Sequence, residues 1–265
     1  MAGPQSRGHL TPDLGPPALR LPPPPEVSHL VRHFWIPEWD LPAGVVHRQL
    51  VLTYPAVNLA VEPSGIAVYG PHTTISHRDL SGRGWAVGAL LLPAAVPLVT
   101  DDVRRLVDSD APLAEPTLHA DVAAQMATQM HNRHPDRHAN AVRRVAAWLT
   151  TRARDQWPDG IPAEALLANR LFDTVHADDT ILRLDDLADR LGLSPRTVQR
   201  LAARYVGLTP AAMIRRRRLQ DAADRVRAGA ALAEVATELG YADQAHLTRD
   251  FRLVLGFTPG EFRSA

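Results

Sequence analysis

The sequence predicts an α+β protein: a β-rich N-terminal small barrel or sandwich with helices, followed by an all-α domain with two helix-turn-helix units joined by a linker helix. Three observations predict this fold class. Short β-branched or Leu-rich runs, separated by Pro and Gly, fill residues 27–110. From about Ala114 the apolar residues recur at helical spacing. After residue 180 one helix-turn-helix pattern occurs twice.

Composition limits the classes of protein this chain can be. It has 265 residues, enough for two modest domains. It has no Cys, which excludes a disulfide framework, a Cys-zinc site and a Cys nucleophile. No apolar run approaches the roughly 20 residues that span a bilayer, and the start lacks a signal-peptide pattern. We therefore expect a cytoplasmic protein with no membrane partner.

Charge is divided unevenly, although the formal net charge is zero. Residues 180–265 carry 14 Arg against 10 Asp and Glu, whereas residues 1–179 carry 15 Arg against 19 acidic residues. This uneven charge favours a C-terminal domain that binds a polyanion. A solvated helical domain can carry the same balance, so charge alone does not decide the function.

The N-terminal elements follow from composition and periodicity. Residues 1–25 hold eight Pro and are predicted to form a disordered, Pro-rich tail. Strands are predicted at Gln49–Tyr54, Val57–Glu62, Gly65–Tyr69 and Trp85–Leu92. Helices are predicted from about Ala114, where apolar residues repeat every four positions up to Met130, and at Ala141–Arg154 and Ala163–Val175. We place a domain boundary near residue 178, which separates residues 26–177 from residues 178–265.

The first helix-turn-helix unit begins with a helix at Leu184–Leu191. Gly192 supplies a positive φ for the turn, Ser194 is an N-cap, and Pro195 sits at the first position of the next helix. The inward residues are Val198, Leu201 and Tyr205. The outer face carries Arg196, Gln199, Arg200 and Ala203. Arg can bond guanine and Gln can bond adenine in the major groove, whereas an ordinary helical hairpin with a solvated face is the alternative.

The second unit repeats this plan 48 residues later. Leu232–Leu239 is the first helix, Gly240 takes the place of Gly192, and Asp243 caps the next helix. Its inward residues are Leu247, Phe251 and Leu255, and its outer residues are Gln244, Thr248, Arg249 and Arg252. Two copies of one plan favour DNA reading over a chance hairpin.

A linker helix is predicted at Pro210–Ala228, ended by Gly229. Its nineteen residues span roughly 28 Å, near the ~34 Å of one turn of B-DNA. A rigid rod of this length would set the two recognition helices into successive major grooves. Within it, the run Arg215–Arg218 cannot all face one way. Some of these Arg are expected to reach phosphates, and others to pair with acidic residues: Asp185, Asp186 or Asp221.

The C-terminal residues resemble the AraC/XylS family of transcription regulators. The resemblance covers about residues 180–263. It rests on Gly240–Phe251, on Gly256–Pro259 with Phe262-Arg263, and on Gly207–Pro210, where the same Gly-x-Thr-Pro motif ends the first unit. It implies a seven-helix domain that binds promoter DNA, with base contacts at Arg196, Gln199, Arg200, Gln244, Thr248 and Arg249. Three positions depart mildly from the family pattern: Tyr241, His246 and Arg252.

The N-terminal half resembles the β-rich sensory domains of some AraC-type regulators. The similar segments are His33-Phe34-Trp35, Leu52–Leu59 and Val87–Pro93. Such domains bind a small effector or mediate dimerisation in the family. The resemblance thus implies a sensory and dimerisation domain at residues 26–177, a homodimer, and RNA polymerase as a partner. The alternative is a DNA-anchored protein-interaction module without a small ligand.

Other candidate sites have weaker support, and we expect no enzyme activity and no cofactor. No Ser lies in a nucleophile-elbow pattern. His131, His134 and His138 have a spacing that zinc accepts, but Pro135 interrupts the helix between them, so no metal site is predicted. An effector pocket could be lined by Trp35, Trp39, Tyr54, Tyr69 and Trp85. Arg48 would then meet an anionic effector, or else form a surface ion pair.

Overall fold

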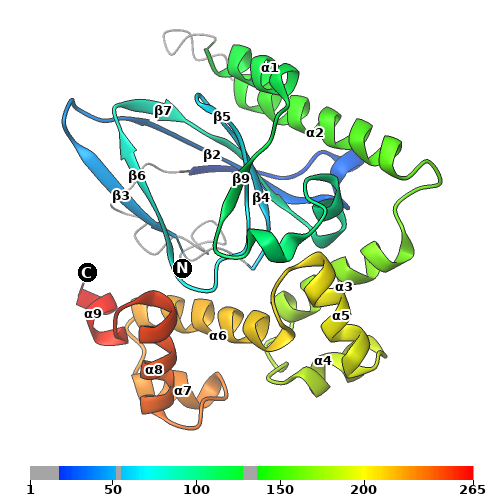
Figure 1. The fold of residues 1–265 in the computed structure, drawn as a ribbon. Helices are drawn as coiled ribbons and strands as arrows, with labels where there is room; N and C mark the ends of the chain where they lie inside the picture. Colours follow the sequence, from blue (N-terminus) through cyan, green and yellow to red (C-terminus); the bar gives the residue numbers. More distant parts are fainter. Residues whose placement is uncertain (1–17, 52–54, 128–135, 265) are drawn as a thin grey trace.

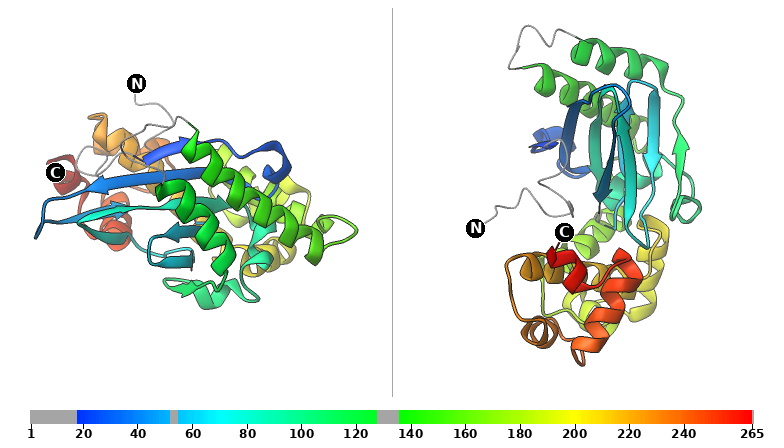
Figure 2. Two further views of the ribbon diagram at one scale, coloured as in Figure 1. Left: turned by 90° about the horizontal axis from the view of Figure 1, so that it is seen from above. Right: turned by 90° about the vertical axis from the view of Figure 1, so that its left-hand side faces the viewer.

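The computed structural model describes residues 18–51, 55–127 and 136–264. A β-rich half and a helical half are stacked on one another (Figure 1, Figure 2). The strands are β1 (Ala18–Leu21), β2 (Val31–Asp40), β3 (Val46–Val51), β4 (Asn58–Glu62), β5 (Gly65–Tyr69), β6 (Ser76–Ser81), β7 (Arg83–Trp85), β8 (Val87–Leu91) and β9 (Asp110–Pro112). The helices are α1 (Pro116–Ala127), α2 (Arg137–Gln156), α3 (Ala163–Ala177), α4 (Leu184–Leu191), α5 (Pro195–Tyr205), α6 (Pro210–Arg227), α7 (Leu232–Glu238), α8 (Gln244–Leu255) and α9 (Pro259–Ser264).

The main sheet is antiparallel, in the order β1-β2-β8-β4-β5-β9, and β7 pairs with the far end of β2. β3 and β6 form a separate two-stranded ribbon beside it (Figure 1). Side chains alternate between the two faces of the sheet. Phe34, Leu59 and Val68 belong to a core shared with α1 and α2, which cover that face. The predicted β-rich half with helices is confirmed.

A second core joins the two halves. Buried residues of α3, α4, α5 and the start of α6 pack with Leu90 and with the 3-10 helix Pro93–Leu98. Asn169 of α3 reinforces this junction, since its amide donates to the carbonyl of His29 and accepts from the N–H of Ala94, both at 2.8 Å. Because α3 shares a core with the C-terminal helices, we propose a boundary before Ala163 rather than near residue 178.

The second helix-turn-helix unit has a core of its own, built from α7, α8 and the later part of α6. Phe251 is fully buried there, and the rings of Phe257 and Phe262 pack against it. The first unit is therefore packed against the β-rich half, while the second is joined to it by α6 and by the loop of residues 72–75.

Part of the predicted disordered tail is ordered, which corrects the expectation for residues 18–25. Ala18–Leu21 forms β1, and Pro25–Val27 forms a 3-10 helix. β1 lies at the edge of the sheet and pairs only with β2. An edge strand needs hydrogen bonds on one side alone, so flanking prolines are compatible with it.

Several strands differ from the prediction. β2, β6 and β9 were not predicted, because Pro37 interrupts the first, the second is the polar run Ser76–Ser81, and the third is three residues long. The strand predicted at Gln49–Tyr54 begins earlier, at Val46, and residues 52–54 lie outside the described residues. The three N-terminal helices are confirmed, although Met130 also lies outside. Among the described residues no helix is both long and apolar enough to cross a membrane.

Candidate DNA interface

The first helix-turn-helix unit forms as its local signals require. α4 ends at Gly192, which has φ of +66°. The Ser194 hydroxyl then accepts a hydrogen bond from the N–H of Thr197, and Pro195 opens α5. Val198 and Leu201 are fully buried in the core between α3 and α4. These contacts fix which face of α5 remains outside.

The outer face of α5 is accessible. Its predicted members are all exposed: Arg196, Gln199, Arg200 and Ala203. Arg200 and Arg204 lie one turn apart, and both donate to the carboxylate of Glu164 in the first turn of α3. The hydrogen bond from Arg200 lowers the pKa of Glu164, so this carboxylate remains charged near neutral pH.

The second unit repeats the geometry. Gly240 has φ of +70°, and the Asp243 carboxylate accepts from the N–H of His246 at 2.6 Å to cap α8. The predicted inward residues are buried: Leu247, Phe251 and Leu255. Of the predicted outer residues, Gln244, Arg249 and Arg252 are exposed and Thr248 is half-buried. α5 and α8 thus both keep an exposed basic and polar face.

All four Arg of the run Arg215–Arg218 have partners within the protein, and Arg216 and Arg217 are too buried to reach phosphate, which corrects the expectation for these two. Arg215 pairs with Asp250 of α8 at 2.8 Å. The guanidinium of Arg218 donates to the carbonyl of Leu239 at 2.7 Å and lies 3.9 Å from the centre of the Tyr241 ring. These contacts join α6 to both helices of the second unit.

Arg217 and Arg216 are more deeply buried, at 4% and 3% relative exposure. Arg217 donates to the carbonyl of Ile181 at 2.9 Å and lies 3.6 Å from Asp221, so the predicted pairing with Asp221 is confirmed. Asp186 instead accepts from the N–H groups ahead of α4 and caps that helix. Because α6 contacts α3, α5, α7 and α9, the guanidinium groups of Arg215–Arg218 find partners inside the protein.

Arg216 joins the second unit to the β-rich half. Its guanidinium donates to the carbonyls of His72 and Thr74, in the loop between β5 and β6. The N–H of Ile75 donates to the carbonyl of Val254 in α8 at 2.8 Å. Burial lowers the pKa of Arg216 to about 10, so it stays protonated at neutral pH. We call residues 72–75 the latch loop.

Asp108 holds the latch loop from the other side. Its carboxylate accepts from the N–H and the hydroxyl of Thr73, both at 2.6 Å. Asp108 has φ of +56°, a left-handed conformation that Asp adopts more readily than most residues. The loop is therefore fixed between the β-rich half and the second helix-turn-helix unit.

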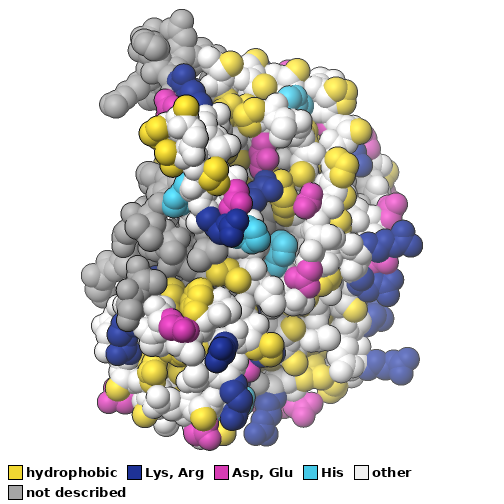
Figure 3. All heavy atoms as spheres, turned by 60° about the vertical axis from the view of Figure 1, so that its left-hand side comes forward, with side chains coloured by type: hydrophobic (Ala, Val, Ile, Leu, Met, Phe, Trp, Pro, Cys, Tyr) yellow, Lys and Arg dark blue, Asp and Glu magenta, His cyan; other side chains and the backbone are white. Residues whose placement is uncertain are grey.

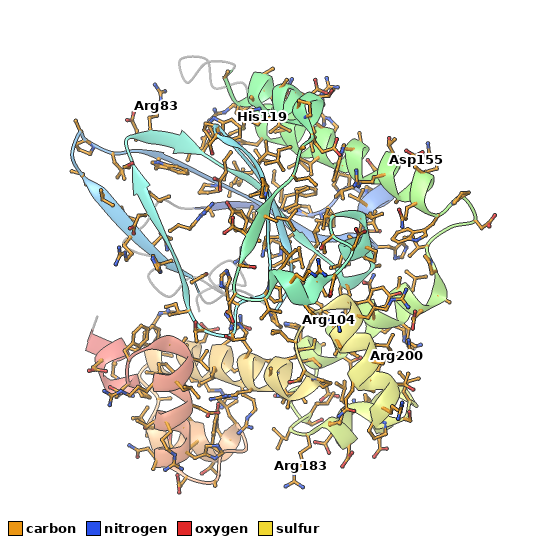
Figure 4. The ribbon with its side chains drawn as sticks, viewed as in Figure 1. Arg83, Arg104, His119, Asp155, Arg183 and Arg200 are labelled. Carbon is orange, nitrogen blue, oxygen red and sulfur yellow. The ribbon has the colours of Figure 1, made fainter. Side chains whose placement is uncertain are left out.

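A groove of about 360 Å³ runs between α5 and residues 101–104 of the β-rich half. Its lining residues are Asp101, Asp102, Arg104, Arg200, Ala203 and Arg204. Arg104 and Arg200 lie near one another across this junction, whereas Arg183 points away from the body of the protein (Figure 4). In Figure 3 basic side chains gather along the lower right edge, with acidic ones among them. α5 thus borders the β-rich half directly.

The candidate effector residues divide into two groups. On the sheet face opposite α1 and α2, the Trp35 indole donates to Asn58 at 3.1 Å, and the Tyr69 hydroxyl, Glu62 and Arg78 contact one another. Elsewhere, Trp39 covers Gly84, Trp85 packs against the helix-covered core, and Arg48 pairs with Asp79 at 2.7 Å. Tyr54 lies outside the described residues.

The metal expectation rests mostly outside the structure. His131 and His134 are not among the described residues. His138 lies 3.4 Å from the carboxylate of Glu38. The described residues contain no group of three or more His, Asp or Glu arranged to hold a metal ion.

His33 on β2 gives an expected pH dependence of stability. Burial, followed by the charges of Arg20 and Arg32, lowers its pKa from 6.5 to about 4. As pH falls below 6.5, the unfolded chain takes up a proton that the folded chain does not. The free energy of unfolding should therefore fall between pH 6.5 and 4, and His33→Gln should reduce that slope in urea titrations. The exposed His77→Gln is the control, and an unchanged slope in His33→Gln would contradict the assignment.

Sequence reasoning did not identify Glu164, which contacts α5, or Asn169 and Asp108, which hold the two halves together. Glu164 follows Pro162 at the start of a helix, where an acidic residue ordinarily complements the helix dipole. No signal in the sequence distinguishes that common role from a contact with α5, 36 residues away.

Comparison with known proteins places the two halves separately. Residues 187–265 match the helix-turn-helix domain family, and residues 19–112 match a domain of unknown function (DUF6597). The chain is 35% identical over 89 residues to the Transposon Tn10 TetD protein of Escherichia coli, covering 33% of this chain and 64% of TetD. It is 32% identical over 157 residues to a putative AraC-like transcription regulator of Streptomyces lividans, covering 57% and 46%.

The chain is also 36% identical over 78 residues to the HTH-type transcriptional activator RhaS of Escherichia fergusonii, covering 29% of this chain and 28% of RhaS. It therefore spans less than two thirds of the length of each of these relatives. Among solved structures, ToxT of Vibrio cholerae aligns with a TM-score of 0.41 and 11% identity over 87% of this chain and 97% of ToxT. Residues 187–265 are thus a helix-turn-helix domain of the AraC type, and the chain is similar to AraC-like transcription regulators.

Proposed function

We propose that this protein binds promoter duplex DNA through α5 and α8 together and thereby regulates transcription. The observation that carries the proposal is the pair of capped helices with exposed Arg and Gln faces, joined by α6. The 18 residues of α6 span roughly 27 Å, near one turn of B-DNA. The base contacts fall on the six predicted residues: Arg196, Gln199, Arg200, Gln244, Thr248 and Arg249.

The direct test is selection of bound duplexes from a random-sequence library by the purified full-length protein. We expect enrichment of a bipartite site whose two parts are about one helical turn apart. Replacing the Arg and Gln residues of α5 should alter one part, and replacing those of α8 the other. Enrichment of no sequence would count against sequence-specific binding.

Affinity for the selected duplex should fall steeply as salt rises. Each phosphate contact releases counterions and contributes about 0.9 to the slope of log affinity against log salt. Fluorescence anisotropy from about 50 to 200 mM salt measures this slope. A response near zero would show that no phosphates are contacted, and would leave α5 and α8 without the backbone contacts that position reading helices.

We propose that the β-rich half modulates DNA binding by taking a small effector on the sheet face that carries Trp35, Asn58 and Tyr69. Aromatic side chains with a few convergent polar groups are typical of small-molecule sites. The alternative is a protein-interaction module without a small ligand. It is favoured by the hydrogen bonds that these side chains already make within the protein. Thermal shifts in a metabolite library distinguish the two.

The remaining aspects of the proposal follow the family. RhaS is named as an activator, and we propose activation here, with RNA polymerase as a partner and a homodimer as the acting form. We further propose a cytoplasmic location and action by binding rather than catalysis. Chromatography of the full-length protein with light scattering tests the dimer directly.

A further inference from the structure

Glu164 contacts the DNA-reading helix although it lies outside both helix-turn-helix units. One carboxylate oxygen, Oε1, accepts from Nη1 of Arg200. The other, Oε2, accepts from Nη1 of Arg204 at 2.9 Å and from the hydroxyl of Tyr205 at 3.3 Å. One acidic side chain on α3 thus ties down two Arg residues that lie one turn apart on α5.

The position of this carboxylate is itself fixed. Ala165 and Ala168 of α3 are buried in the core that also contains Leu201 and Ala202 of α5. α3 and α5 are therefore packed together, and the side chain of Glu164 is only 30% exposed. A carboxylate held by packed helices is a stable anchor for a long side chain.

The hydrogen bonds leave one edge of the Arg200 guanidinium open. Nη1 is engaged, whereas Nε and Nη2 make no hydrogen bond to any residue that the structure describes. The Arg200 side chain is 56% exposed. Reading guanine takes two donors of one guanidinium at once. The geometry leaves such a pair available while the carboxylate restrains the plane of the group.

From this arrangement we propose that Glu164 is a positioning residue that sets Arg200 for base reading. The inference rests on the proposed function, in which α5 reads bases. An Arg side chain loses rotamer freedom when it binds, and a contact made in the free protein removes part of that loss. Arg249 on α8 has no such partner among the described residues. The two reading helices therefore differ in how far their Arg side chains are preorganised before DNA binds.

The competing role for the Glu164 carboxylate is to mask the Arg side chains of α5 from DNA. A mask would neutralise the reading helix and compete with DNA, and its removal would raise affinity. A masking carboxylate is expected to occupy two donors of one guanidinium, since that pairing is the strongest. Glu164 instead divides its oxygens between two side chains. This division favours positioning.

The test compares Glu164→Gln, Arg200→Ala and the double variant in the full-length protein. Asp173→Asn is the matched control, because Asp173 also lies on α3 and also pairs with an Arg, Arg32, at 2.8 Å. Each variant selects duplexes from a random library, and each is titrated with the wild-type duplex and a random duplex. Base preferences among bound duplexes do not depend on the fraction of folded protein, so a partly unfolded variant remains informative.

We expect Glu164→Gln to lower the ratio of specific to random affinity about 3- to 10-fold, the gain expected from holding one side chain in place. It should relax base preference at the same positions as Arg200→Ala, and the double variant should match Arg200→Ala alone. Asp173→Asn should change neither quantity. Tighter binding by Glu164→Gln, or unchanged preference while Arg200→Ala relaxes it, would overturn the inference alone. No effect of Arg200→Ala would overturn the proposed reading by α5 and the inference with it.

Discussion

Replacing Arg216 by Met is expected to lower the free energy of unfolding by about 1–3 kcal/mol. The change removes a buried guanidinium and leaves the carbonyls of His72 and Thr74 without their donor. A buried polar group without a partner costs about 1–3 kcal/mol, and the loss stays within that range because the two carbonyls lie on half-buried His72 and exposed Thr74. The loss should concentrate where the latch loop meets the second helix-turn-helix unit.

Urea unfolding measures the stability change, and amide hydrogen exchange locates it. Arg225→Met is the matched control, because Arg225 also lies on α6 but pairs with Glu238 at the surface. Exposed ion pairs contribute about 0–1 kcal/mol. We expect faster exchange in the latch loop and α8 for Arg216→Met alone. Equal stability losses in the two variants would show that Arg216 does not join the halves.

Replacing Arg200 or Arg249 by Ala is expected to cost about 1–3 kcal/mol of specific DNA binding each, or roughly 5- to 150-fold in Kd. Each Arg is exposed on the outer face of its recognition helix. Loss of a two-donor contact to a base removes discrimination at that base pair. Binding to random duplexes should fall much less than binding to the selected duplex.

Competition binding with the selected and random duplexes separates these two quantities. Arg83→Ala is the control, because Arg83 lies at the far end of the β-rich half (Figure 4). An unchanged specific affinity in Arg200→Ala or Arg249→Ala would remove that residue from the reading face. Equal losses on both duplexes would instead assign it to phosphate contact.

Local signals were sufficient for the helix-turn-helix units. Gly192 and Gly240 take the positive φ that the turns need, and Ser194 and Asp243 cap the following helices as predicted. The apolar periodicity of α5 and α8 also identified which side chains are buried. Each of these features depends on residues within one or two helical turns, so a short window of sequence contains it.

Long-range contacts were beyond such reasoning. Charge and spacing suggested phosphate contacts for Arg215–Arg218, yet Arg216 is bonded to carbonyls 144 and 142 residues away. A carbonyl acceptor has no signature in the sequence, because every residue carries one. The β-rich half was predicted less completely for a related reason: β2 and β6 are stabilised by their partner strands rather than by their own composition.

By itself the sequence determined the fold class, the two helix-turn-helix units and the faces that α5 and α8 expose, because capping, turn chemistry and periodicity act locally. Only the tertiary structure decided that α3 shares a core with α4 and α5, that Glu164 reaches Arg200, and that Arg215–Arg218 of α6 find partners within the protein. The physical reason is that residues far apart in the chain come into contact only when the helices and strands pack. Polar groups that packing removes from water must then hydrogen-bond to one another.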